Sequence, residues 1–260
     1  MKVQKLYSLI LASMLFQSVQ YGQVNEEPFA VDAVPSMQKH YVKTSEIIGI
    51  AVPSAMIMYG FISLGDNGIR VLDFDVKKSI ERNHAFWHTH MDDYMQFTPA
   101  IAAYTMKLFK IESAHHLADM TIVYGLSNCL AGGIVGQTKK WTGRERPDHS
   151  NNRSFPSGHT ETAFVSAEFL HQEYKNQSVW ISIGGYSAAA FVGIARIYNN
   201  KHWISDVVAG AGIGILSTKA IYWTYPYLQK IFRQKDQPHQ AFIFPAYSNG
   251  NLSLNLFHTF

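Results

Sequence analysis

The sequence has little cysteine and little charge, and both shortages exclude classes of protein. Cys129 is the single cysteine among 260 residues, which excludes an intramolecular disulfide and a zinc cluster built on thiolates. Only 16% of the residues are charged, below the usual share of about a quarter, whereas the apolar share of 47% is ordinary. A chain of this length and composition can bury a large core, so we exclude a disordered or acidic solvating chain.

Neither sign of charge dominates the sequence. Lysine and arginine number 22 against 19 aspartates and glutamates, which gives a net charge of +3 and a pI near 8.8. This balance is too mild to indicate a nucleic-acid partner, and the chain has no internal repeat or low-complexity segment. The mean hydropathy of −0.07 is low for a polytopic membrane protein and high for a soluble secreted one, so both classes stay open.

The first residues have the pattern of an export signal. Lys2 and Lys5 precede the apolar run 6–16, and small residues such as Gly22 follow it. No A-x-A site fixes a cleavage point, so we expect residues 1–23 to be either a signal peptide or the first membrane helix. In both cases the chain is exported or inserted, and its chemistry faces outside the cytoplasm.

Uncharged runs joined by short polar connections predict an all-α protein, a multi-helix bundle of about six core helices. These runs cover residues 47–64, 121–138, 178–195, 207–218 and 220–228. Their lengths are typical of buried helices and are close to the ~20 residues that span a bilayer. Residues 160–175 also have a helical pattern, but their charged side chains suit an independent membrane span poorly. We expect one helical domain over residues 24–235.

The C-terminal residues follow a different pattern. Residues 241–247 and 251–257 alternate between apolar and polar side chains around the turn sequence Ser248-Asn-Gly. This arrangement predicts a β-hairpin. We therefore expect residues 236–260 to form a short hairpin-like tail, to which we assign no chemistry.

The first of three polar clusters follows the run 121–138. It reads Lys139-Lys-Trp-Thr-Gly-Arg-Glu-Arg146-Pro147. Arginine binds phosphate oxygens with two parallel hydrogen bonds, and lysine supplies a point charge. A basic flank after a membrane helix is the alternative explanation for Lys139 and Lys140, but it does not explain the Arg-Pro pair.

The second and third clusters supply histidines. In Pro156-Ser157-Gly158-His159, Ser157 is a natural N-cap, and a helix N-terminus with a glycine is suited to anion binding. His202 and Asp206 are four residues apart, so on a helix they would share one face, where the carboxylate would orient the imidazole. Taken singly, a capped helix start or a surface His–Asp pair would explain each cluster as well.

Together the clusters resemble the signature of the type 2 phosphatidic acid phosphatase and vanadium haloperoxidase superfamily. The sequence shows Lys-x6-Arg-Pro, Pro-Ser-Gly-His and Arg-x5-His-x3-Asp in this order, between Lys139 and Asp206. The resemblance implies a metal-independent phosphatase without a cofactor. His202 would attack phosphorus and form a phosphohistidine, Asp206 would hold its ring, and His159 would protonate the leaving oxygen and then activate water. The implied phosphate-binding groups are Lys139, Arg146, Ser157, Gly158 and Arg196.

Two features depart from the family pattern. The third motif usually opens with Ser-Arg, whereas here it is Ala195-Arg196, and the link between Pro147 and Pro156 is short. The upstream string His88-Thr-His-Met-Asp-Asp-Tyr94 invites a metal-site interpretation, which we reject in favour of a helix start or an interhelical loop. We expect no metal.

The resemblance covers membrane-embedded lipid phosphatases, soluble periplasmic acid phosphatases and haloperoxidases. We favour an inner-membrane enzyme with a periplasm-facing site, because the order of the runs brings Lys139 and Arg196 to one side and the basic residues after 228 to the other. The substrates would be lipid A, isoprenyl pyrophosphates or phosphatidyl phosphates. A soluble periplasmic acid phosphatase is the alternative, a haloperoxidase a remote one, and a non-catalytic protein would need a broken motif. The sequence leaves the oligomeric state open.

Overall fold

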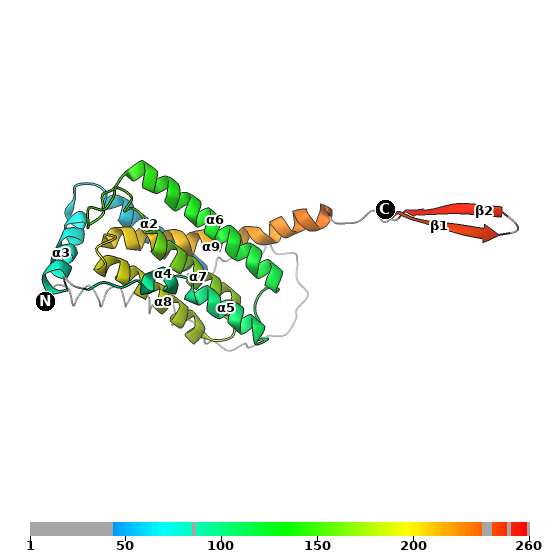
Figure 1. The fold of residues 1–260 in the computed structure, drawn as a ribbon, viewed down its shortest axis with the longest axis horizontal. Coiled ribbons are helices and arrows are strands. Elements are labelled where there is room, and N and C mark those ends of the chain that lie inside the picture. The colour runs from blue at the N-terminus through cyan, green and yellow to red at the C-terminus, as the bar shows by residue number, and fades with distance from the viewer. Residues whose placement is uncertain (1–43, 85–86, 236–240, 249–250, 259–260) are drawn as a thin grey trace, which may run out of the picture. The chain divides into compact units, whose positions relative to one another are not determined.

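A computed structural model describes residues 44–84, 87–235, 241–248 and 251–258, and these residues are mostly helical (Figure 1). The predicted signal or membrane helix over residues 1–23 lies outside this part of the chain, as does the predicted turn at 249–250. The described helices are α2 (Thr44–Ile62), α3 (Gly68–Asn83), α4 (Met91–Met95), α5 (Thr98–Leu108), α6 (Leu117–Thr142), α7 (Gly158–Tyr174), α8 (Val179–Tyr198) and α9 (Ile204–Lys235). The predicted helical bundle is confirmed.

The chain divides into two compact units, one up to Ile221 and one from Tyr222, so α9 contributes to both. In the second unit, β1 (Ala241–Ser248) pairs with β2 (Asn251–His258) in antiparallel register. The alternation in the sequence predicted this pairing.

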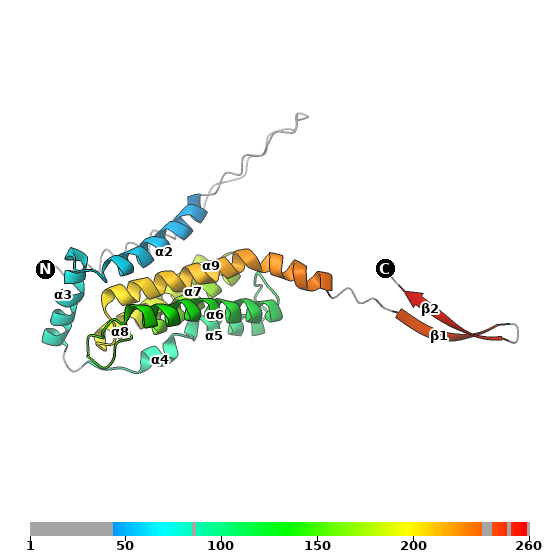
Figure 2. The ribbon, with the colours of Figure 1, turned by 90° about the horizontal axis from the view of Figure 1, so that it is seen from above.

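Helix α7 is the central element of the first unit. It packs against α5, α6 and α8, which lie beside it in both views (Figures 1 and 2). Its side chains are buried around most of its circumference, and Phe169 and Val165 are fully buried. A helix that is covered on all sides forms the core of the bundle.

Two of the acidic side chains that make α7 a poor independent span, Glu168 and Glu173, are paired inside the bundle. Glu168 Oε1 lies 2.9 Å from Lys219 Nζ of α9, and the Tyr186 hydroxyl donates to the same carboxylate. Glu173 Oε1 lies 2.9 Å from His115 Nδ1. Because α9, α8 and the connection before α6 partner these two carboxylates, their charges are compatible with a buried position.

Helix α9 approaches α7 closely because it presents glycines to it. A Cβ added at Gly210 would lie 2.5 Å from the Ser157 carbonyl oxygen, and one added at Gly214 would lie 2.5 Å from the Glu161 carbonyl oxygen. Any larger residue at these positions would force the two helices apart. The spacing of four residues between the glycines keeps both on the face that meets α7.

Four helix ends meet at one end of the bundle. The C-termini of α6 and α8 and the N-termini of α7 and α9 are joined there by two connections, residues 143–157 and 199–203. The Ser157 amide donates to the Asp206 carbonyl over 3.0 Å, and Lys201 Nζ lies 2.6 Å from Asp148 Oδ2. This end of the bundle therefore carries all three sequence clusters.

Three of the described helices are long and apolar enough to cross a membrane: Leu117–Thr142, Val179–Tyr198 and Ile204–Lys230. On α6, four aliphatic side chains at four-residue spacing are 37–50% exposed: Ile122, Leu126, Leu130 and Ile134. Such a stripe is an unusual surface in water and a suitable one against lipid.

Candidate active site

His202 and Asp206 lie together, although not on one helix as the spacing predicts. His202 precedes α9 and Asp206 lies in its first turn. The backbone amide of His202 donates to the Arg196 carbonyl oxygen at the end of α8, over 3.3 Å. His202 Nδ1 is buried and lies 3.5 Å from Asp206 Oδ2, longer than an ordinary hydrogen bond, and it has no hydrogen-bond partner among the described residues. The pairing is thus made across the start of α9.

The environment of His202 favours its neutral form. The side chain is almost fully buried, and this burial lowers its pKa to about 4. Asp206 raises the pKa, whereas the positive charges of Lys139 and Arg196 lower it further. A neutral imidazole is the nucleophilic form, so His202 is ready to attack at neutral pH.

Asp206 is held from several directions. Arg144 Nη1 donates to Oδ1 over 2.8 Å, and the Trp203 amide donates to Oδ2 over 2.9 Å. The Ser154 hydroxyl also donates to Oδ2. A buried carboxylate with this many donors is fixed in place, and it can fix the histidine beside it.

His159 is the second residue of α7 and contacts α4. Its Nε2 lies 2.9 Å from Asp93 Oδ1. Arg196 at the end of α8 donates to Asp92 Oδ2 over 2.6 Å and lies 3.8 Å from Asp93. The predicted helix start at 88–94 is confirmed, but the sequence did not reveal that its two aspartates join the predicted site.

The two predicted phosphate-binding arginines each keep one buried donor free. Among the described residues, Arg146 Nε and Arg196 Nε are buried and have no hydrogen-bond partner. Burial lowers the pKa of Arg146, and the nearby charge of Arg196 lowers it further. Unpaired buried donors are costly in a protein, and an anion would satisfy them.

Lys139 is engaged by the backbone of the adjacent loop. Its ammonium group donates to the carbonyl oxygens of Arg153, Ser154 and Pro156, over 2.9, 3.4 and 2.5 Å. In this arrangement, Lys139 shapes the loop that precedes α7, and its charge also acts on His202. The sequence predicted a direct phosphate contact and gave no sign of this second task.

Ser157 and Gly158 begin α7 as predicted. Ser157 is the N-cap residue, but its hydroxyl bonds to Thr160 Oγ1 over 2.9 Å instead of capping the backbone. A Cβ added at Gly158 would find only Val135, 4.0 Å away. The N-terminus of α7 therefore keeps uncapped amide groups beside His159.

The short link between the first two clusters is tied to the third cluster. Asp148 forms an ion pair with Lys201, and the Trp203 indole donates to the Glu145 carbonyl over 2.9 Å. Although partial burial raises the pKa of Asp148, the bond from Lys201 and the Ser150 contacts lower it to about 2. No group of three His, Cys, Asp or Glu side chains in the described ranges is arranged to hold a metal.

Comparisons with known proteins agree with this arrangement. The family profile described as PAP2 superfamily matches residues 120–230. The lipid A 1-phosphatase of Porphyromonas gingivalis is 40% identical over 159 residues, which cover 61% of this chain and 34% of that protein. The phosphatidylglycerophosphatase B of Bacillus subtilis is 34% identical over 110 residues, which cover 37% of this chain and 52% of that protein.

The chain thus spans about a third to a half of the length of these curated relatives. Among solved structures, the LpxE of Aquifex aeolicus is 22% identical, with a TM-score of 0.42, over 56% of this chain and 93% of that one. The profile match includes the three clusters between Lys139 and Asp206. Residues 120–230, which carry all three clusters, therefore match the PAP2 superfamily.

Proposed function

We propose that this chain is a lipid phosphatase that hydrolyses a phosphomonoester or pyrophosphate through a phosphohistidine at His202. The observation that carries the proposal is a buried, neutral His202 that shares one end of the bundle with the unpaired Nε donors of Arg146 and Arg196. The names of two relatives, lipid A 1-phosphatase and phosphatidylglycerophosphatase B, support a lipid phosphate as substrate.

The reaction would proceed in two displacements. Because Nδ1 of His202 faces Asp206, Nε2 is the attacking atom. Its bond to phosphorus forms while the bond from phosphorus to the ester oxygen breaks, and His159 donates a proton to that oxygen. Water then attacks phosphorus, His159 takes the water proton, and the bond to Nε2 breaks. Asp206 stabilises the positive charge on the phosphorylated imidazole.

The cationic and amide groups would stabilise the charge of the transferring phosphoryl group. The Nε donors of Arg146 and Arg196, the Ser157 hydroxyl and the uncapped Gly158 amide would bind its oxygens, and Lys139 would add positive charge. Phosphoryl transfer depends mainly on such positioning and charge stabilisation.

The exposed surface supports a membrane-embedded enzyme over a soluble one. The aliphatic stripe of α6 would face lipid. Trp141 is 78% exposed at the end of α6, and Trp180 is 74% exposed at the start of α8. Tryptophans gather at both interfaces of a bilayer, so these residues suit the two ends of a span. We propose that the end with His202 faces the periplasm.

Replacement of the nucleophile tests the proposal. We expect His202→Ala to abolish phosphate release from a short-chain phosphatidic acid in detergent micelles, because no other group replaces the attacking nitrogen. His116→Ala, at an exposed position before α6, is the matched control and should retain wild-type turnover. Wild-type turnover by a folded His202→Ala enzyme would refute the assignment.

A further inference from the structure

A second buried network lies behind the His202–Asp206 pair and reaches helix α3. Asp73 of α3 is fully buried, and its Oδ2 accepts a hydrogen bond from Arg144 Nη2 over 2.6 Å. The other terminal nitrogen, Nη1, donates to Asp206 Oδ1 over 2.8 Å. One guanidinium group therefore bridges two buried carboxylates.

Ser205 closes this network. Its hydroxyl accepts from Arg144 Nη1 over 2.8 Å and donates to Asp73 Oδ2 over 2.6 Å. Its backbone amide donates to Asp73 Oδ1 over 3.1 Å. The first turn of α9, which carries Asp206, is thereby bonded to α3 through both backbone and side chain.

Neither Asp73 nor Arg144 belongs to the three sequence motifs. Asp73 lies outside the matched residues 120–230, and Arg144 lies between Lys139 and Arg146 without belonging to the Lys-x6-Arg-Pro pattern. Both side chains are too deeply placed to be a surface ion pair, since Asp73 is 0% and Arg144 is 10% exposed. Buried ion pairs of this kind fix a geometry more than they add stability.

The arrangement has a direct consequence for the nucleophile. Oδ1 of Asp206 is occupied by Arg144, which leaves Oδ2 toward His202 Nδ1. If Arg144 were free to turn, Asp206 would lose the partner of Oδ1, and only the Trp203 amide and the Ser154 hydroxyl on Oδ2 would hold the carboxylate beside His202. Asp73 on Nη2 and Ser205 on Nη1 restrain the guanidinium and oppose this loss.

We infer that Asp73 and Arg144 are positioning residues for phosphoryl transfer: they hold Asp206 in the rotamer that aligns His202 for attack. This inference rests on the proposed function. It makes α3 part of the catalytic apparatus, although no residue of α3 belongs to the sequence motifs.

Kinetics on phosphatidic acid micelles separate this role from a general loss of stability. We expect Asp73→Asn and Arg144→Ala each to lower kcat by about tenfold to a hundredfold, with little change in KM. Loss of a residue that orients a functional side chain typically has an effect of this size. Asp75→Asn, an exposed aspartate on the same helix, should have wild-type kinetics.

A double-mutant cycle tests whether Asp73 acts through Arg144. The effect of Asp73→Asn on kcat should largely disappear in the Arg144→Ala background, because both changes release the same contact. Additive effects in folded proteins would overturn the inference. If Asp73→Asn does not fold, Ser205→Ala replaces it in the cycle, and a wild-type kcat for that variant would also overturn it.

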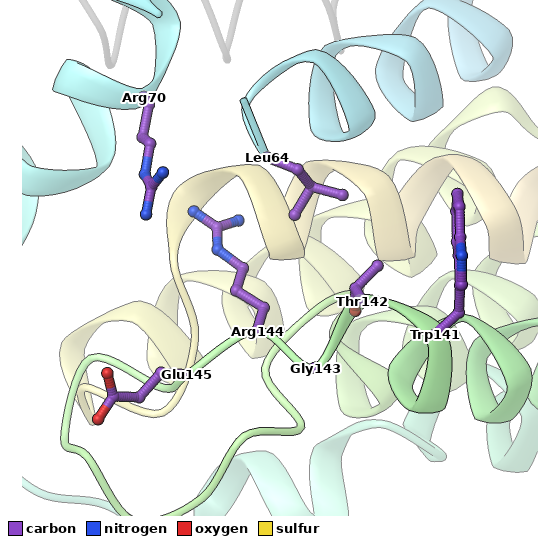
Figure 3. Close-up of a pocket in the computed structure, with 7 residues that line it drawn as sticks. All are labelled: Leu64, Arg70, Trp141, Thr142, Gly143, Arg144 and Glu145. Atoms are coloured by element: carbon purple, nitrogen blue, oxygen red, sulfur yellow. The ribbon is translucent and has the colours of Figure 1, made fainter. Parts of the chain in front are cut away.

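The pocket beside Arg144 allows chemical rescue. It has a volume of about 430 Å³, and in Figure 3 the Arg144 side chain extends into it near Arg70, with Trp141 on another wall. A guanidinium ion could therefore enter from solvent and occupy the place left in Arg144→Ala. We expect added guanidinium to raise kcat of Arg144→Ala severalfold and to leave Asp206→Ala inactive.

The two proposals fail in different ways. If wild-type protein releases no phosphate from any lipid phosphate, the proposed function is wrong. If wild-type protein is active and depends on His202, but guanidinium does not rescue Arg144→Ala and Asp73→Asn keeps full kcat, the proposed function stands and the inference about Asp73 and Arg144 is wrong.

Discussion

At the scale of single residues, the motifs identified the histidines but not the groups that orient them. His202, His159 and Asp206 follow from short spacings in the sequence. Asp92 bonds Arg196 across 104 positions, and Asp93 bonds His159 across 66 positions. No local pattern links residues so far apart, and only the packing of α4 against α8 and α7 brings them together. Lys139 likewise resembles a phosphate ligand in sequence, yet it donates to three loop carbonyls.

The depressed pKa of His202 predicts the pH dependence of the reaction. An ordinary histidine is protonated below about pH 6.5 and could not attack phosphorus there. Burial lowers the pKa of His202 to about 4, so the acid limb that it causes in kcat/KM should lie near pH 4. A pH profile on phosphatidic acid micelles measures this limb. An acid limb of kcat/KM near pH 6.5, the pKa of an ordinary histidine, would contradict the argument that burial lowers the pKa of His202.

The same shift has a consequence for stability. Between the folded-state pKa of about 4 and the ordinary value, the unfolded chain binds a proton that the folded chain does not. Stability should therefore fall as the pH falls through this window. Thermal unfolding followed over the same pH range reports this change independently of turnover.

At the scale of elements, the long apolar helices and the charged helix α7 could be predicted from the sequence, whereas α3 could not. Long uncharged runs in the sequence predicted α2, α6, α8 and α9, because a helix that is shielded from water has few charged side chains. Helix α3 carries charged residues along much of its length, and its importance lies in one buried position, Asp73. A single buried charge gives no periodic signal, so no pattern in the sequence marks this helix.

The close contact between α9 and α7 gives a prediction at this scale. We expect Gly210→Ala to lower the stability by about 1–3 kcal/mol, as overpacking does, and to reduce kcat, because the new methyl group would displace the Ser157 backbone. Gly133→Ala on α6, where a Cβ meets open space, is the matched control. Thermal unfolding and phosphate release measure both effects. Equal stability and equal kcat of the two variants would show that the close contact between α9 and α7 matters for neither property.

At the scale of the whole molecule, the proposed membrane orientation places opposite bundle ends on opposite sides. The connection 143–157 lies at the end with the site, and the connection 175–178 lies at the other end of α7 and α8. The single cysteine, Cys129, lies within α6, so its replacement by serine gives a background for labelling.

Cysteine labelling in intact cells tests this orientation. In the Cys129→Ser background, we expect Ser150→Cys to react with a membrane-impermeant maleimide from the periplasmic side. Asn176→Cys, also exposed, should react only after the inner membrane is permeabilised. Equal labelling of both positions from the periplasm would indicate a soluble protein, and the reverse pattern would indicate a cytoplasmic site.

The most direct test of the phosphohistidine at His202 is a trapping experiment. The enzyme reacts with phosphatidic acid that carries a radioactive phosphate, the reaction is quenched rapidly without acid, and the labelled peptide is mapped. We predict a base-stable, acid-labile label on His202 that is absent in His202→Ala and accumulates in His159→Ala, where activation of water is lost. Turnover by wild-type enzyme without a label in either wild type or His159→Ala, or a label that persists in His202→Ala, would contradict it.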